Sequence, residues 1–246
     1  MNKIPVYYHI PKCGGTYVIT KCREILRFHN NGLSAIRIQD KENNQTIVRC
    51  FVKKNIELDI DIYNDYDCLL KHVNNILFIT IEASGIKLRD NILNNIKNTY
   101  EFMTIRDPFD RIQSMYNYIT SEASKHEPSH GSIKDKKFEE YMENPNYEKN
   151  WISLQFSTEK ETLINKLKNI NIYKMQNIEK SISDCFKACH PDIDCSRYNA
   201  NLVNMHRNTI KPKKISINDV PNEVINKFLK YNDLDYFIYD KCCNLE

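Results

Sequence analysis

Residues 9–16, near the N-terminus, place a lysine and two glycines where they could hold an anion. The segment reads His-Ile-Pro-Lys-Cys-Gly-Gly-Thr and follows the apolar residues 4–8. Gly14 and Gly15 have no Cβ atom, so their backbone N–H groups can approach an anion closely. Lys12 adds a positive charge, and a helix that begins after the glycines would add the positive end of its dipole. The segment therefore predicts a phosphate-binding loop.

The spacing of this loop differs from that of the common nucleotide-binding loop, G-x-x-x-x-G-K-[ST]. Lys12 precedes the two glycines, and no second lysine follows them. Two interpretations are open on these residues alone. The segment is either a variant anion-binding loop or a tight turn that joins a strand to a helix without binding anything.

A second anion site is predicted about ninety residues further along the chain. The apolar residues 102–105 run directly into Arg106, and Asp107 with Pro108 is typical of a helix start. Ser114 lies two turns into that helix, so Arg106 and Ser114 could supply one charged and one neutral donor. In the alternative interpretation, Arg106 pairs with Asp107 or Asp110, and Ser114 is simply solvated.

The helical spacing also divides the side chains of this second element into two faces. We expect an apolar face made of Phe109, Ile112, Met115, Tyr116 and Ile119. We expect the opposite side to carry Asp110, Arg111, Ser114 and Tyr118.

Together, the two elements resemble the sulfotransferases that use 3′-phosphoadenosine 5′-phosphosulfate (PAPS). The resemblance is to the Golgi glycan branch, which includes heparan sulfate 2-O- and 6-O-sulfotransferases. Residues 9–16 are similar to that family's 5′-phosphosulfate loop, in which threonine or serine often stands at the place of Cys13. Residues 106–114 are similar to its 3′-phosphate element. Weaker similarity continues at residues 150–156, 172–179 and 235–239, so it spans nearly the whole chain.

The resemblance implies an enzyme that moves a sulfuryl group from PAPS to a hydroxyl of an acceptor, with a carbohydrate as the expected class. Negative charge would grow on the departing phosphate oxygen, and Lys12 would stabilise it. The scheme needs no metal. The cofactor-binding residues that the resemblance implies are Lys12, Cys13, Gly14, Gly15, Thr16, Tyr17, Arg106 and Ser114.

The acceptor hydroxyl also needs a group that takes its proton. Many glycan sulfotransferases place a histidine just beyond the strand that precedes the arginine element, and Glu82 stands at about that place here. Glu82 is therefore the predicted catalytic base, with a surface or capping glutamate as the alternative. His72, His126 and His130 are reserve candidates, and His9 is interpreted as a structural residue beside the turn.

Two other function classes stay open. A P-loop kinase or nucleotide hydrolase would need a lysine after the glycines, which the chain lacks. A non-catalytic protein that binds PAPS or its product 3′-phosphoadenosine 5′-phosphate (PAP) would keep the loop without the base. The missing histidine favours this second alternative.

Composition bounds the class of protein. With 41% hydrophobic residues and a formal net charge of +3, the 246-residue chain is a foldable polar sequence without the wide basic field of a nucleic-acid scaffold. Its mean hydropathy is −0.59, and it has no long apolar run, so we expect no membrane span. No signal peptide is evident, which predicts a cytoplasmic protein; the Golgi lumen is the alternative if the chain is part of a longer one.

Cysteines give no strong signal for metal. The nine cysteines include Cys185, Cys189 and Cys195, which with His190 could suggest zinc. Paired C-x-x-C spacing is missing, so we expect no metal site.

The expected fold is α/β: a three-layer, P-loop-like fold with a mainly parallel central sheet of about four or five strands and helices on both sides. Strands are predicted over residues 4–9, 76–81, 102–105 and 170–174. Helices are predicted over residues 16–28, 108–120, 179–188 and 221–231.

Residues 1–246 are expected to form a single sulfotransferase domain with two unusual stretches. Residues 34–75 contain a predicted hairpin followed by acidic residues, and we interpret them as an insertion. Residues 121–149 are polar and contain two prolines. They are interpreted as a mobile acceptor-side loop, with plain solvated surface as the alternative.

Overall fold

The structure is a computed structural model, and it describes the chain in segments. These are residues 3–39, 46–54, 62–63, 73–83, 86, 93–94, 96, 98–121, 133–144, 149–198 and 214–241. The chain divides into two compact units, Met1–Ile105 with Ile164–Arg207 and Arg106–Leu163 with Asn208–Glu246. The single domain over residues 1–246 stays a prediction.

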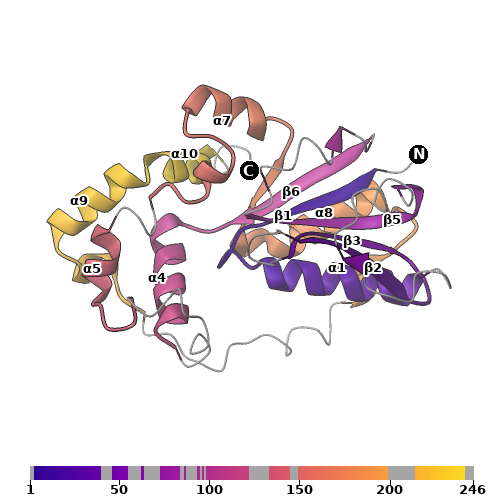
Figure 1. Ribbon diagram of the computed structural model, residues 1–246, viewed down its shortest axis with the longest axis horizontal. Helices are drawn as coiled ribbons and strands as arrows, with labels where there is room; N and C mark the ends of the chain where they lie inside the picture. Colours follow the sequence, from indigo (N-terminus) through magenta and orange to yellow (C-terminus); the bar gives the residue numbers. More distant parts are fainter. Residues whose placement is uncertain are drawn as a thin grey trace. The chain divides into compact units, whose positions relative to one another are not determined.

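The first unit is built on an open sheet that is parallel at its centre (Figure 1). The described strands lie in the order β4-β2-β3-β5-β1-β6-β7. β1 pairs in parallel with both β5 and β6, and β6 pairs in parallel with β7. Their bounds are β1 (Ile4–His9), β2 (Leu33–Gln39), β3 (Thr46–Lys53), β4 (Ile62–Tyr63), β5 (Ile76–Glu82), β6 (Thr99–Ile105) and β7 (Asn171–Lys174).

The predicted hairpin exists and is part of the central sheet. β2 and β3 pair antiparallel, and β3 also pairs antiparallel with β5. The hairpin therefore extends the central sheet, and the expected count of four or five strands was too low for this reason. The parallel centre agrees with its sequence, because strands buried on both faces are nearly continuous apolar runs, as in β5.

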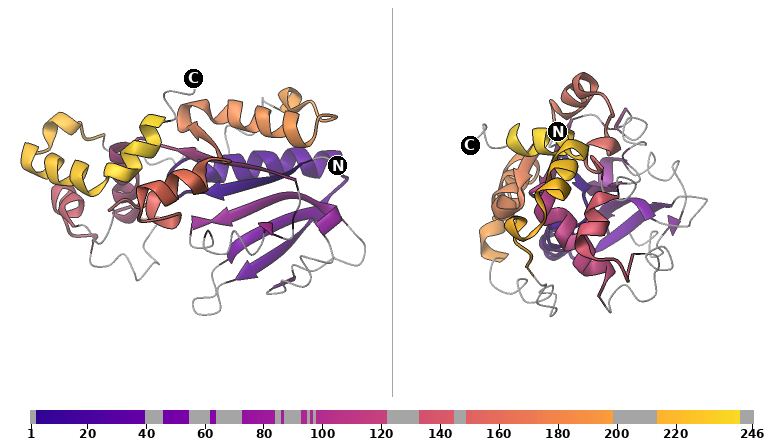
Figure 2. Two further views of the ribbon diagram at one scale, coloured as in Figure 1. Left: turned by 90° about the horizontal axis from the view of Figure 1, so that it is seen from above. Right: turned by 90° about the vertical axis from the view of Figure 1, so that its left-hand side faces the viewer.

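Helices α1 (Gly15–His29) and α8 (Ile178–Cys189) pack on the same face of this sheet (Figure 2). Both have one apolar stripe, which meets aromatic side chains of the strands, among them Tyr7, Phe78 and Phe102. The described residues thus confirm an α/β fold with an open sheet flanked by helices. A helical layer on the opposite face stays a prediction.

The second unit is helical and has its own core. Its helices are α4 (Pro108–Ile119), α5 (Phe138–Glu143), α9 (Asn222–Tyr231) and α10 (Asp233–Lys241), and α7 (Lys160–Leu167) crosses the border between the units. Short 3-10 turns are η1 (Val73–Asn75), η5 (Ser153–Gln155), η6 (Met175–Asn177), η7 (Cys195–Tyr198) and η9 (Ile217–Asp219). The four predicted helices are confirmed with ends within one or two residues.

Part of the predicted acceptor-side loop is an ordered helix. Within residues 121–149, α5 buries Phe138, Tyr141 and Met142 in the core of the second unit. The polar composition of the stretch concealed this short amphipathic segment. Residues 122–132 and 145–148 lie outside the described part of the chain.

The start of α4 follows the sequence prediction. The Asp107 carboxylate accepts hydrogen bonds from the amides of Phe109, at 2.9 Å, and Asp110, at 3.1 Å, and Pro108 occupies the first turn. A carboxylate at this position satisfies amides that have no partner in the helix. Arg106 therefore directly precedes a well-defined helix start.

Arg111 contradicts the predicted outer face of α4. Its side chain is 1% exposed, and its guanidinium lies 5.1 Å from the centre of the Trp151 ring. Burial raises the pKa of Asp235, while the charge of Arg111 acts to lower it. The sequence pattern predicted an exposed Arg111 because charged residues of a helix usually face solvent. In the fold, the Trp151 ring and the buried Asp235 carboxylate accommodate its charge.

Two of the weaker motifs meet in the second unit. The Asn150 side-chain oxygen accepts hydrogen bonds from the amides of Leu234, at 2.9 Å, and Asp235, at 3.2 Å. Asp235 in turn accepts from the amides of Ile152, at 3.0 Å, and Ser153, at 2.8 Å. Residues 150–156 and 235–239 are thus joined by buried hydrogen bonds, which gives them a structural role.

Among the described residues, no helix has both the length and the apolar character that crossing a membrane requires.

Candidate functional site

The loop between β1 and α1 has a backbone that glycine favours. Gly14 has φ +83° and is the N-cap residue of α1, and Lys12 also has a positive φ, +66°. Lysine rarely adopts this left-handed conformation, and holding it there costs about 1 kcal/mol or more. Stored backbone strain of this kind is concentrated at functional sites.

Both glycines are also required by their neighbours. A Cβ atom on Gly15 would lie 2.0 Å from Cδ2 of His9, and one on Gly14 would lie 2.7 Å from Cδ1 of Ile178. Side chains at either position would displace the imidazole or the first residue of α8. The Gly-Gly pair therefore lets β1, α1 and α8 approach one another at the loop.

The amides of the loop differ in whether they already have an acceptor. The Cys13 amide donates to the Ile10 carbonyl at 3.3 Å, and the Tyr17 amide donates to the Gly14 carbonyl at 3.0 Å. Within the described chain, the amides of Gly14, Gly15 and Thr16 have no acceptor. Three neighbouring donors at the positive end of α1 are thus left for a ligand.

Hydrogen bonds from the neighbouring strand hold the loop in place. The Thr104 hydroxyl, on β6, donates to the Cys13 carbonyl at 2.7 Å, and it shares a 2.7 Å hydrogen bond with the Tyr7 hydroxyl. Burial raises the pKa of Tyr7 strongly, so this hydroxyl stays protonated. The Cys13 side chain is fully buried, so it contributes to packing rather than to the ligand-facing side of the loop.

Tyr17 is committed to a contact between the two helices. Its hydroxyl donates to the Glu179 carboxylate on α8, and the Lys21 ammonium forms an ion pair with the same carboxylate. Lys21 is 2% exposed although it is charged. The side chain of Tyr17 thus joins α1 to α8, and Glu179 belongs to the weakly similar segment 172–179.

His9 and Glu82 form a pair at the end of the sheet. They are the last residues of the adjacent parallel strands β1 and β5, and they lie directly opposite each other in the register. Nδ1 of His9 is 2.6 Å from Oε2 of Glu82. The two side chains are 20% and 26% exposed. The predicted base is therefore in contact with the histidine that was interpreted as structural.

The second predicted anion element belongs to the other unit. Arg106 is the residue after β6, and its Nε lies 3.9 Å from Oδ2 of Asp110, a long and partly exposed ion pair. Ser114 is half-buried on α4. Burial raises the pKa of Asp107, although the hydrogen bonds from the amides of Asp110 and Phe109 act to lower it. Arg106 and Ser114 belong to the second unit, whereas the loop at the start of α1 belongs to the first.

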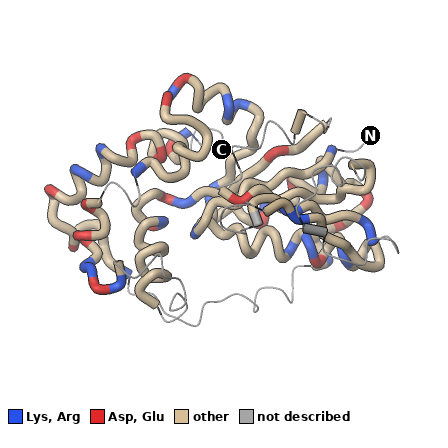
Figure 3. Tube along the Cα trace, in the orientation of Figure 1, with Lys and Arg blue, Asp and Glu red and all other residues tan. Residues whose placement is uncertain are grey.

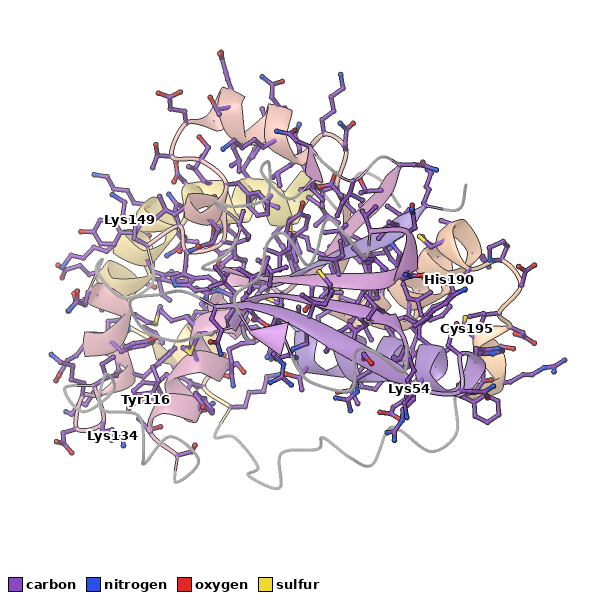
Figure 4. All side chains as sticks on the ribbon, turned by 45° about the vertical axis from the view of Figure 1, so that its right-hand side comes forward. Lys54, Tyr116, Lys134, Lys149, His190 and Cys195 are labelled. Carbon is purple, nitrogen blue, oxygen red and sulfur yellow. The ribbon has the colours of Figure 1, made fainter. Side chains whose placement is uncertain are left out.

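The cysteines near α8 pack into the protein. Cys185 and Cys189 are buried, and Nε2 of His190 is 3.0 Å from the Leu77 carbonyl oxygen of β5. Burial raises the pKa of the Cys195 thiol. Cys195 follows His190 in the sequence, and both residues are labelled in Figure 4. No group of three or more metal-binding side chains gathers among the residues that the structure describes.

Charged residues of both signs are interspersed along the described elements (Figure 3). The first turn of α1 contains no acidic residue, so no carboxylate of that turn competes with an anion for the helix end. The reserve bases His72, His126 and His130 lie outside the described residues.

Comparisons with known proteins give no relative: no protein-family model, curated protein or solved structure matches the chain.

Sequence reasoning missed three contributors to the loop. Thr104 and Glu179 hold its backbone and its helix, and His9 pairs with Glu82. One signal was present for the last pair: both residues directly follow apolar runs that were predicted as parallel strands. Parallel strands place their carboxyl ends at one edge of a sheet, so two polar residues at those ends can meet.

Proposed function

We propose that this chain is a PAPS-dependent sulfotransferase that transfers a sulfuryl group to a hydroxyl, with a carbohydrate as the acceptor class. The observation that carries the proposal is the loop at the start of α1. Gly14, Gly15 and Thr16 offer three amides without an acceptor at the positive end of a 15-residue helix, and Lys12 lies two residues before Gly14. Such a group of donors suits the 5′-phosphosulfate of the cofactor.

The phosphate at the 3′ position distinguishes PAPS from ATP. β6 lies beside β1 in the sheet, and the chain continues from β6 into Arg106 and the helix that carries Ser114. In the proposal, these two residues hold the 3′-phosphate. The long Arg106–Asp110 pair supports this role, since a guanidinium 3.9 Å from its carboxylate is not committed to a close ion pair.

The proposed reaction is an in-line transfer between two oxygens. The acceptor oxygen forms a bond to sulfur while the bond from sulfur to the 5′-phosphate oxygen breaks, and the electron pair of that bond leaves on PAP. Lys12 stabilises the charge that develops on the departing oxygen, and the three amides hold the phosphate in place. A three-layer, P-loop-like arrangement of the whole chain is part of the same proposal.

The first test is the choice of nucleotide, measured by isothermal titration calorimetry with PAP, AMP and ATP. We expect PAP to bind at least tenfold more tightly than AMP, and the Arg106→Met variant to lose most of this preference. Arg23→Met is the control, because Arg23 is an exposed arginine of α1 paired with Glu24. Binding of ATP that is equal to or tighter than that of PAP would contradict the proposal and favour a kinase or hydrolase.

The second test is transfer itself. Mass spectrometry of a mixed library of glycans and simple alcohols, incubated with PAPS, should identify a sulfated product. Lys12→Ala should reduce the rate by a factor of about 100 or more while the melting temperature stays close to that of the wild type. Tight PAP binding without any sulfated product would favour the non-catalytic alternative.

A further inference from the structure

The contact between His9 and Glu82 assigns a definite state to the imidazole. A carboxylate only accepts hydrogen bonds, so Nδ1 of His9, 2.6 Å from Oε2, is the protonated nitrogen. In the neutral ring, Nε2 then carries the lone pair. A carboxylate that fixes a histidine tautomer in this way is a recurring arrangement where the other nitrogen takes up a proton.

The free nitrogen points to the loop. Nε2 of His9 lies 2.7 Å from the position that a Cβ atom of Gly15 would occupy, so it stands beside the first residue of α1. Because Gly15 has no Cβ, the imidazole can lie directly against the first residue of α1. The side chain of His9 is 20% exposed.

Glu82 is less suited to take the proton itself. Its Oε2 is already held by the Nδ1–H group, and a proton arriving there would weaken that hydrogen bond. The lone pair on Nε2 of His9 can take up a proton, which suits a general base better than a carboxylate oxygen that is already hydrogen-bonded. In this pair, His9 is thus suited to accept a proton, and Glu82 is suited to orient the imidazole.

We infer that His9 is the proton acceptor of the transfer reaction and that Glu82 is its positioning residue; this inference rests on the proposed function. The acceptor O–H bond breaks and its proton moves to Nε2 as the oxygen–sulfur bond forms and PAP departs. Glu82 stabilises the imidazolium through Nδ1–H. The imidazolium then releases its proton to water, and the pair returns to its starting state.

Two substitutions separate the roles in steady-state kinetics. His9→Ala should lower kcat by a factor of 10² to 10⁴, the range of general base catalysis, with PAP affinity within threefold of the wild type. Glu82→Gln should lower kcat by about 10- to 100-fold, as for other groups that orient a histidine, with little change in KM. If Glu82→Gln removes all activity while His9→Ala keeps most of it, Glu82 is the base and the inference is overturned. Loss of PAP binding in His9→Ala would overturn it as well.

The tautomer gives a readout that does not depend on activity. ¹⁵N NMR of histidine in the intact wild type, at a pH where the ring is neutral, should show a protonated Nδ1 and a bare Nε2 for His9, and Glu82→Gln should shift the ring toward the other tautomer. A wild-type ring with the proton on Nε2 overturns the inference even if sulfate transfer is found. A wild type that binds no PAP refutes the proposed function and the catalytic role together, while the NMR signal still reports whether the pair exists.

Discussion

Gly15 and His9 depend on each other at the scale of single residues. The imidazole occupies the space that any side chain at position 15 would need, since a Cβ there would come within 2.0 Å of it. From the sequence, we expect a glycine at position 15 to let the backbone N–H approach an anion. The structure gives a second reason for glycine at this position, because the His9 ring leaves no room for a side chain.

Gly15→Ala should therefore displace His9 and disturb the loop. We expect a loss of about 1–3 kcal/mol in the free energy of unfolding, the usual cost of overpacking, and at least a tenfold weaker affinity for PAP. Denaturant unfolding and calorimetry measure the two effects.

Gly32→Ala is the matched control for this change. Gly32 lies beyond the other end of α1, has φ +125°, and its added Cβ would lie 2.9 Å from Cδ of Lys54. It should also destabilise the protein, yet leave PAP affinity unchanged. If both variants bind PAP as the wild type does, the loop is not the nucleotide site.

At the scale of elements, α1 and α8 are joined by a charged network as well as by apolar packing. Lys21 is nearly inaccessible, and Glu179 on α8 supplies its counter-charge while accepting from Tyr17. Burial acts to raise the pKa of Glu179, but the hydrogen bonds from Lys21 and Tyr17 outweigh it and hold the pKa below its ordinary value of 4.5. The folded state thus binds this proton less readily than the unfolded state.

Stability should depend on pH accordingly. The contribution of Glu179 is present above its unfolded pKa of about 4.5 and is lost as pH falls through the lower folded pKa. At pH 7, Glu179→Gln should lower the free energy of unfolding by about 1 kcal/mol. This value is small for hydrogen bonds to a charged group, because about half of the Glu179 side chain is exposed. The difference between wild type and variant in urea unfolding should shrink as the pH falls below 4.5.

Glu24→Gln provides the comparison on the same helix. Glu24 pairs with the exposed Arg23 at 3.0 Å, so its removal should change stability by a few tenths of a kcal/mol. Equal losses in the two variants, or a difference that does not vary with pH, would mean that the network does not stabilise the contact between α1 and α8.

At the scale of the whole molecule, the residues proposed to hold the cofactor are divided between two compact units. The loop belongs to the unit that contains the sheet, and Arg106 and Ser114 belong to the helical unit. The proposal therefore makes a separate prediction for each unit, in which the loop contacts the 5′-phosphate and Arg106 with Ser114 contacts the 3′-phosphate.

Hydrogen exchange can test this division. PAP should slow amide exchange at residues 12–17 and at residues 106–114, whereas AMP should slow it only at residues 12–17. At a PAP concentration of 100 times its Kd, we expect about 2.7 kcal/mol of added stability for the wild type. Protection by PAP confined to the first unit would show that Arg106 and Ser114 do not bind the 3′-phosphate.

Several features follow from the sequence alone because their causes are local. Gly14 takes a positive φ that glycine adopts at no steric cost, and Asp107 with Pro108 starts a helix through hydrogen bonds to its own neighbours. The strands β1, β5 and β6 follow from short apolar runs. The strand, loop and helix that make the predicted phosphate site could therefore be found in the sequence.

The tertiary structure decided which residues meet there. His9 and Glu82 are 73 positions apart, Thr104 and Cys13 are 91 apart, and Tyr17 and Glu179 are 162 apart. Such pairs depend on the order and register of the strands and on the packing of α8 against α1, which local patterns do not specify. The same reason explains why Arg111 is buried against Trp151. The sequence thus predicted a loop for an anion, and the fold determined that a histidine–glutamate pair stands beside this loop.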